Sequence, residues 1–296
     1  MSRLTARDFA PEVLRLFDQY VHGQLDRRGF LQGAGKYTTA AVSAEMLLAQ
    51  LAPNFAQAQQ VSPEDPRLVT AYVEIPSPQG HGTVQGYVVK PARASGKLPT
   101  VLVAHENRGL NPHIADVARR LALEDFIVVA PDALSSLGGY PGDEDKARAL
   151  FQTLDPARAR ADFVAAARWL KAHPEGNGKT GVVGFCYGGS VANHLAVQLT
   201  ELDAAVPFYG GQPPAEEVGR IRAPLLIHYA EHDERINAGW PKYEEALKQA
   251  RVRHEVHFYP GTQHGFHNDT TPRFDQTAAT LAWQRTLAFF NRHLRA

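Results

Sequence analysis

Residues 182–189 read Val182-Val183-Gly184-Phe185-Cys186-Tyr187-Gly188-Gly189 and place the only cysteine of the chain between two structural elements. The apolar run before Cys186 is typical of a buried strand, and the small residues after it are typical of a helix start. A sharp strand-to-helix turn brings the chain close to itself two positions before and after its tip, so Gly184 and Gly188 must be small. The stretch predicts a nucleophile elbow with Cys186 at its tip.

The helix that begins at the elbow would favour chemistry at the sulfur. Its first backbone N–H groups and its partial positive charge favour a thiolate, and also any oxyanion that forms beside it. The alternative is a small buried thiol, which is what most free cysteines are. The motif alone leaves both interpretations open, because a nucleophile also needs a base and an acidic partner.

Short apolar strands alternate with amphipathic helices on both sides of the elbow. Strands are expected at residues 100–104, 126–130, 181–185, 204–209, 224–229 and 255–259, and helices at 114–124, 156–172, 188–199, 241–249 and 277–293. A hairpin is expected at 68–75 and 83–89. The pattern predicts an α/β fold over residues 61–296, with a mostly parallel sheet between two helical layers. Ligands of such sheets bind outside the carboxyl ends of the strands.

Asp233 and His264 follow two later strands, in the chain order nucleophile, acid, histidine that such an elbow uses. Asp233 lies just past strand 224–229, and His264 lies on the loop after strand 255–259. His264 would take the thiol proton or stabilise the thiolate, while Asp233 would fix the tautomer of His264. The sequence therefore predicts a triad of Cys186, His264 and Asp233.

The other histidines have less support as catalytic groups. His228 lies inside a strand and is typical of a core residue, and His232 fits a surface loop. The pairs His228 and His232, or His264 and His267, have a spacing that metal ligands use, but no third ligand is placed to converge on either pair. We therefore predict neither a metal ion nor a cofactor.

The loop His105-Glu106-Asn107-Arg108-Gly109 follows directly on strand 100–104, where an enzyme of this architecture supplies its second oxyanion N–H. Together with residues 184–189, Asp233 and the run Tyr259-Pro260-Gly261-Thr262-Gln263-His264-Gly265-Phe266, this loop resembles the dienelactone hydrolase family. The resemblance covers roughly residues 65–296 and implies an α/β-hydrolase fold.

The same resemblance implies a role for each matching residue. Cys186 would be the nucleophile, with Asp233 and His264 as its partners, and the oxyanion hole would be formed by the backbone N–H groups of Asn107 and Tyr187. Glu106 would contact the resting thiol, raise its pKa by like-charge repulsion and hold it protonated until substrate arrives. An ion pair between Glu106 and Arg108 is the alternative role for this carboxylate.

The substrate site departs from the family. Its members hold a substrate carboxylate with arginines, one of them shortly after the catalytic histidine, and here Asn268 stands at that distance. Arg108 and Arg273 are candidate replacements, since arginine suits carboxylate recognition, although either could be a surface charge. Tyr140 is a third candidate, on the glycine-rich loop 134–142 that we expect to form a mobile rim of the pocket.

These residues predict a hydrolase of small esters or lactones that acts through an acyl-thioester intermediate. One alternative is a carboxylesterase of broad specificity. Another is a non-catalytic protein of the same fold that binds a ligand or a partner. No sequence feature identifies the natural substrate or the oligomeric state.

Residues 1–60 form an N-terminal extension with two interpretations. Arg27-Arg28-Gly29-Phe30-Leu31-Gln32 resembles a twin-arginine export signal, and Ala56-Gln57-Ala58 fits a cleavage site, which predicts a periplasmic enzyme. Asp26, Lys36 and Glu45 depart from that pattern. The alternative is a cytoplasmic protein that keeps a folded extension, because apolar residues recur at helical spacing at positions 9, 13, 14, 16, 17 and 20.

The composition excludes some partners. The 31 basic side chains of Lys and Arg balance the 31 acidic ones, and no run of like charges could serve as a nucleic-acid arm. No apolar run reaches the roughly 18 residues that a membrane-spanning helix needs. The expected partner is a small molecule.

Overall fold

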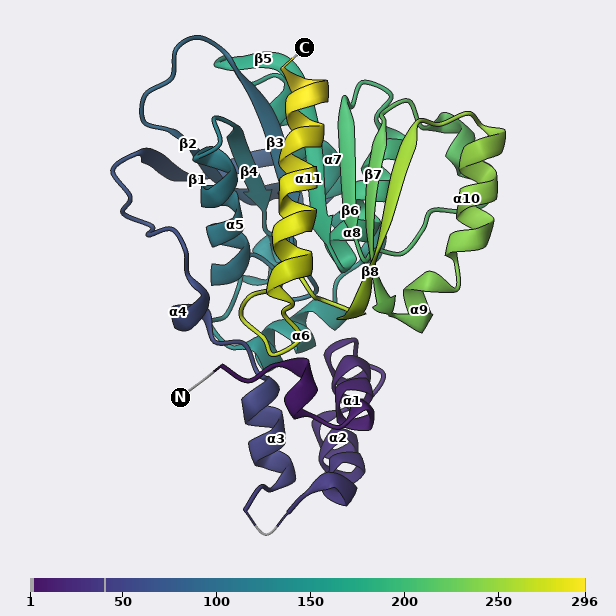
Figure 1. Cartoon of the computed structure of the whole chain (residues 1–296). Coiled ribbons are helices and arrows are strands. Elements are labelled where there is room, and N and C mark those ends of the chain that lie inside the picture. The colour runs from purple at the N-terminus through teal and green to yellow at the C-terminus, as the bar shows by residue number, and fades with distance from the viewer. Residues whose placement is uncertain (1–2, 40, 296) are drawn as a thin grey trace.

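The computed structural model describes residues 3–39 and 41–295, and its centre is one sheet in the order β1-β2-β4-β3-β5-β6-β7-β8 (Figure 1). The strands are β1 (Leu68–Ser77), β2 (Gly82–Pro91), β3 (Leu98–Ala104), β4 (Ile127–Pro131), β5 (Gly176–Phe185), β6 (Ala204–Phe208), β7 (Leu225–His232) and β8 (His254–Gln263). β1 and β2 form a hairpin and β2 is antiparallel to β4, whereas β3 to β8 are parallel. The predicted α/β fold is confirmed.

Two helical layers cover the sheet. On one face lie α5 (Pro112–Ala122) and α11 (Gln276–Leu294), and on the other lie α7 (Pro156–Lys171), α8 (Tyr187–Gln198) and α10 (Trp240–Gln249). These are the five predicted helices, each displaced by no more than two residues. The pattern of the sequence does not predict two short helices, α6 (Glu144–Gln152) and α9 (Glu234–Asn237). It also does not predict the 3₁₀ turns Ala6–Asp8, Gly35–Tyr37, Ser135–Leu137 and Ala215–Arg220. Within the described ranges, no helix is long and apolar enough to span a bilayer.

β5 lies inside the sheet and carries the elbow at its carboxyl end. Val182, Val183 and Phe185 are completely buried. A Cβ atom on Gly181 would lie 2.8 Å from the ring of Phe290, so this glycine leaves room for α11 to pack closely on the strand. Because β3, β5, β7 and β8 are parallel, the residues that follow them meet at one edge of the sheet.

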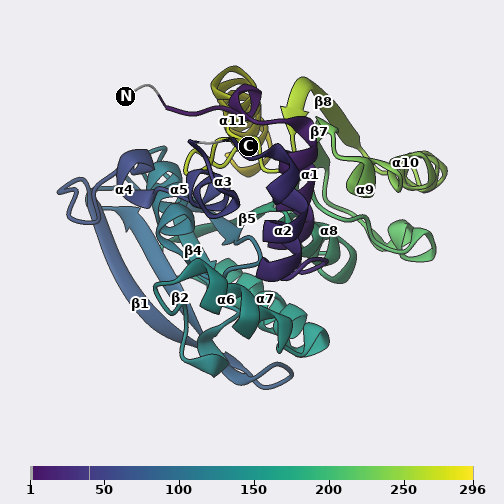
Figure 2. The same cartoon turned by 90° about the horizontal axis from the view of Figure 1, so that it is seen from below.

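The N-terminal residues fold into four helices: α1 (Pro11–Val21), α2 (Arg27–Ala34), α3 (Ala44–Leu51) and α4 (Phe55–Ala58). The apolar faces of α1, α2 and α3 form a small core of their own, which includes Phe17, Phe30 and Leu51. The helical spacing predicted for positions 13–20 is confirmed by α1. Viewed from below, α1, α2 and α3 lie across the edge of the sheet where the elbow ends (Figure 2).

Arg27 and Arg28 lie in the first turn of α2. Asp26 caps this helix and accepts a hydrogen bond from the backbone N–H of Gly29 at 2.7 Å. The residue that departs from the export motif is therefore the residue that starts the helix.

Export followed by cleavage after Ala58 stays a prediction, and the mass of the protein purified from its native host tests it. Export predicts an N-terminus at Gln59, since residues 1–58 would be removed. A native protein that begins at Met1 or Ser2 would contradict the cleavage.

Candidate active site

The tip of the elbow is strained in the way a nucleophile elbow requires. Cys186 precedes α8 and has a φ of 55° with a ψ of −112°, a conformation that residues with side chains rarely adopt. A Cβ atom on Gly184 would lie 1.8 Å from the carbonyl oxygen of Gly188, and one on Gly188 would lie 2.0 Å from the carbonyl oxygen of Ala104. Both glycines are therefore required by the turn.

The structure brings the three predicted triad residues together. Nδ1 of His264 lies 2.5 Å from Oδ2 of Asp233, and both side chains are buried. A ring nitrogen of His264 lies within 4.8 Å of Sγ of Cys186. Because Asp233 occupies Nδ1, Nε2 is the nitrogen of His264 that remains for the sulfur.

The electrostatics favour an ion pair between Cys186 and His264. Burial disfavours the thiolate, but the charges of His264 and His22 outweigh burial and lower the pKa of Cys186 to about 6. Burial also disfavours the imidazolium, yet the charges of Cys186 and Asp233 raise the pKa of His264 to about 10. The net shift of the thiol pKa is therefore opposite to the shift expected from Glu106 alone, because two histidines beside the sulfur favour the thiolate.

His22 is the site residue that the sequence analysis missed. It follows α1 directly, and its Nε2 lies 3.4 Å from Sγ of Cys186. Its ring meets that of His264 edge to face, with 4.8 Å between the centroids. The only local signal was Asp18, four residues earlier, whose carboxylate lies 3.3 Å from Nδ1 of His22.

The loop after β3 provides Glu106 and Asn107. Oε2 of Glu106 accepts a hydrogen bond from Asn268 at 2.7 Å, and the described chain contains no hydrogen bond from Cys186 to Glu106 and no ion pair of Glu106 with Arg108. Its contact with the thiol therefore stays a prediction. Asn268, four positions after His264, orients this carboxylate.

One predicted oxyanion donor, Tyr187, follows Cys186 directly, and the other, Asn107, lies on the loop after β3. Tyr187 is the first residue of α8, so its backbone N–H has no acceptor within the helix. Its ring points away from the turn and packs against Phe151 at 4.8 Å between centroids. The oxyanion role of the Tyr187 and Asn107 N–H groups stays a prediction.

Comparison with known proteins assigns the family. The model described as "Dienelactone hydrolase family" matches residues 84–294, well over half of the chain. The chain belongs to the dienelactone hydrolase family. It is 29% identical over 248 residues to a "Putative carboxymethylenebutenolidase" of Escherichia coli K12, covering 79% of this chain and 90% of that relative. A crystal structure named "Putative Dienelactone Hydrolase", from Klebsiella pneumoniae, has a TM-score of 0.67 at 28% identity and matches over 99% of its own length and 76% of this chain.

The N-terminal part of this hydrolase lies outside the match to the dienelactone hydrolase model. A second model, described as "YqhI-like", matches residues 1–37. The "Putative hydrolase fragment YghX" of Escherichia coli K12 is 60% identical over 106 residues, which cover 36% of this chain and 91% of that fragment. His22 therefore lies on a segment that precedes the matched hydrolase domain.

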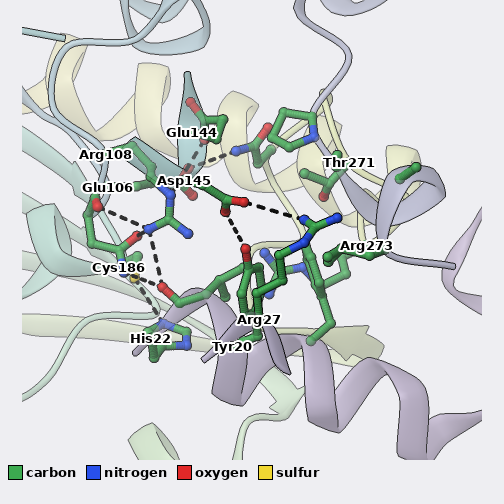
Figure 3. A pocket seen from close by; sticks show the side chains of 18 of the residues that line it. Tyr20, His22, Arg27, Glu106, Arg108, Glu144, Asp145, Cys186, Thr271 and Arg273 are labelled. Atoms are coloured by element: carbon green, nitrogen blue, oxygen red, sulfur yellow. Dashed lines mark hydrogen bonds and ion pairs between the residues drawn. The ribbon is translucent and has the colours of Figure 1, made fainter. Parts of the chain in front are cut away.

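A cavity of about 280 Å³ opens onto Cys186 of the hydrolase (Figure 3). The loops at the edge of the sheet form part of its wall, with Glu106, Asn107, Arg108, His264, Asn268 and Arg273. About half of the described lining residues come from the N-terminal helices, including Phe17, Tyr20, His22, Arg27, Leu48 and Ala52. The extension thus forms a wall of the pocket.

Two of the three predicted substrate-binding residues line this cavity, and both already face carboxylates. Nε of Arg108 lies 3.7 Å from Glu144, and Nη1 of Arg273 lies 3.4 Å from Asp18. The third, Tyr140, is not among the residues that line the cavity. Its hydroxyl donates a hydrogen bond to Glu144 at 2.9 Å.

Two backbone N–H groups of the loop 134–142 are hydrogen bonded to one buried carboxylate, and the mobility of this loop stays a prediction. The carboxylate of Asp132 accepts hydrogen bonds from the backbone N–H groups of Leu110, Leu134 and Tyr140 at 2.9–3.1 Å. This single buried side chain therefore fixes the start of the loop against the loop after β3.

His22, Cys186 and His264 are also the residues of the hydrolase that could hold a metal ion. Their donor atoms lie within 4.8 Å of one another, and the described residues add no fourth protein ligand to this group. Histidines that exchange protons with a thiol must lie as close to the sulfur as metal ligands would. Cys186 also stands on a strained elbow, which a nucleophile requires and a metal ligand does not. We interpret the cluster as an acid–base site, and the predicted absence of a metal stays a prediction.

Proposed function

We propose that this hydrolase cleaves small esters or lactones with Cys186 as nucleophile and an acyl-thioester as intermediate. The observation that carries the proposal is the placement of Cys186 on the elbow, beside a histidine whose Nδ1 lies 2.5 Å from a buried aspartate. Nucleophile, base and orienting acid are the three parts that covalent acyl transfer needs.

In the first step the thiolate attacks the carbonyl carbon, and the new C–S bond pushes an electron pair onto oxygen. The N–H groups of Asn107 and Tyr187 would stabilise this oxyanion. The C–O bond to the leaving group then breaks, and the leaving oxygen takes the proton of the His264 imidazolium. Water next attacks the thioester and gives one proton to an imidazole beside the sulfur; breaking the C–S bond returns the electron pair to sulfur and releases the carboxylic acid.

A broad-specificity carboxylesterase is a second candidate, and the arginines of the pocket favour it. Arg108, Arg273 and Arg27 lie within ion-pair distance of Glu144, Asp18 and Asp145 respectively. A substrate carboxylate would have to compete with these partners, whereas a neutral ester would not. Neutral aryl esters should then react as fast as acidic lactones.

A thiol-reactive probe combined with a panel of esters and lactones tests the proposal. Iodoacetamide should alkylate Cys186 and inactivate the enzyme at a rate that rises with pH around 6, because the thiol loses its proton there. An ordinary cysteine would show the same rise around pH 8.5. Failure to label Cys186, together with no hydrolysis of any panel member, would falsify the proposal.

A further inference from the structure

A second acid–histidine pair reaches the sulfur from the N-terminal helices. His22 Nε2 lies 3.4 Å from Sγ of Cys186, and Asp18 holds the other side of the ring. The triad described above uses neither residue. His22 also lines the cavity from which substrate and water reach the sulfur (Figure 3).

The contacts around His22 define where its proton lies. Nδ1 is 2.7 Å from the backbone carbonyl oxygen of Asp18, so Nδ1 is the nitrogen that donates. Nη2 of Arg235 lies 3.1 Å from Nε2, and a guanidinium only donates hydrogen bonds. Nε2 is therefore the ring nitrogen that carries the lone pair whenever His22 is neutral, and in this structure it faces both Arg235 and the sulfur.

The backbone next to His22 is fixed to the loop after β3. The carbonyl oxygen of Val21 accepts hydrogen bonds from Nδ2 of Asn107 at 2.7 Å and from Nη1 of Arg108 at 3.2 Å. His22 is thereby tied to a predicted oxyanion donor, and its ring is set by contacts on both of its nitrogens. A side chain held this way is preorganised for one task.

We propose that His22 is a second catalytic acid–base residue, which takes the proton from the water that hydrolyses the acyl-thioester. This inference rests on the proposed function. One O–H bond of water breaks, its proton passes to Nε2 of His22, and the oxygen attacks the thioester carbonyl. When the C–S bond breaks, the electron pair returns to Cys186, and solvent carries the proton from His22 to His264, which restores the imidazolium that acylation had used.

The two histidines differ in how firmly they hold a proton at that stage. Burial disfavours protonation of His22, but the charge of Cys186 and the hydrogen bond to Asp18 outweigh burial and raise the pKa of His22. Acylation removes the charge on sulfur from both histidines. His264 keeps Asp233 at 2.5 Å, whereas the Asp18 carboxylate is shared with Arg273 at 3.4 Å and Arg235 at 4.0 Å. His264 thus keeps the stronger carboxylate partner and suits the role of acid, whereas His22 keeps the weaker one, loses its proton more readily and suits the role of base.

His22→Gln tests the assignment with p-nitrophenyl butyrate, whose leaving group needs no proton. The initial burst of nitrophenolate should persist because it reports acylation, while the steady-state rate falls about 100-fold, the lower range for a lost general base. Intact mass should show the butyryl group accumulating on Cys186. Added imidazole should restore part of the steady-state rate in His22→Ala, which a merely structural role would not allow.

Two further variants serve as controls. Gln32→Ala changes an exposed residue of α2 outside the cavity and should leave both phases unchanged. Asp18→Asn should slow the steady state without slowing the burst, and it keeps the test open if His22→Gln does not fold. A burst that slows as much as the steady state, or a His22→Gln enzyme with unchanged turnover, would overturn the role of His22. Wild-type enzyme that forms no acyl group on Cys186 would instead overturn the proposed function.

Discussion

Cys186→Ala is expected to lower kcat/KM for ester hydrolysis at least about 10,000-fold, because it removes the nucleophile on which both steps of the reaction depend. The backbone of the elbow should survive, since alanine and cysteine tolerate the positive φ at this position about equally. Steady-state kinetics with p-nitrophenyl butyrate measures the loss. Circular dichroism of the variant checks that the fold is kept.

Cys186→Ser is the matched comparison for this prediction. It keeps a nucleophilic atom on the elbow, but an alcohol forms no stable ion pair with His264, so we expect activity well below wild type and above Cys186→Ala. Hydrolysis by Cys186→Ala within tenfold of the wild-type rate would show that the thiol is not the nucleophile.

Gly184→Ala is expected to lower the free energy of unfolding by at least about 3 kcal/mol, the range of severe backbone clashes. The new Cβ would lie 1.8 Å from the carbonyl oxygen of Gly188. The turn cannot open to relieve this contact, because a shift of Gly188 meets the carbonyl oxygen of Ala104 on the neighbouring strand. We expect a lower midpoint of thermal unfolding and loss of activity, since any movement displaces Cys186.

Gly219→Ala is the control for the glycine prediction. A Cβ atom there would have no neighbour within 4 Å, and its φ is not positive, so stability should change by no more than about 0.5 kcal/mol. If Gly184→Ala unfolded at the same temperature as Gly219→Ala, the close approach at the elbow would be wrong. Thermal unfolding of both variants followed by circular dichroism decides the matter.

The sequence was sufficient to predict the sheet and the positions of Cys186, Asp233 and His264, because each prediction depends on spacing or on the end of a strand. Steric demands fix the spacing of Gly184, Cys186 and Gly188. Parallel strands carry Asp233 and His264 to the same edge as the elbow, so chain order and strand ends were enough to locate them. Burial of His228 was also predictable, because its neighbours in the strand are apolar and a position among them lies in the core.

His22 could not be found by such rules. Its contact with Cys186 joins residues 164 positions apart, and helical periodicity shows which face of α1 is buried but not what that face covers. The expected triad order also directed attention to residues after the nucleophile, whereas His22 precedes it. Helix α6 was missed for another reason, since Ala147 is its only fully buried residue and the apolar pattern is correspondingly weak.

The cavity is lined by two parts of the chain, the loops of the hydrolase domain and the N-terminal helices, and each part would determine a different property of the enzyme. In the proposed mechanism acylation depends on the loops of the hydrolase domain, whereas Leu48, Ala49 and Ala52 of the N-terminal segment line the cavity beside those loops. A cavity of about 280 Å³ is just below the usual range for small-molecule pockets, so a single added methylene on that wall is a large fraction of the free space. Chain-length preference can therefore diverge between related enzymes through substitutions in the first sixty residues alone, while the machinery that breaks the bond stays the same.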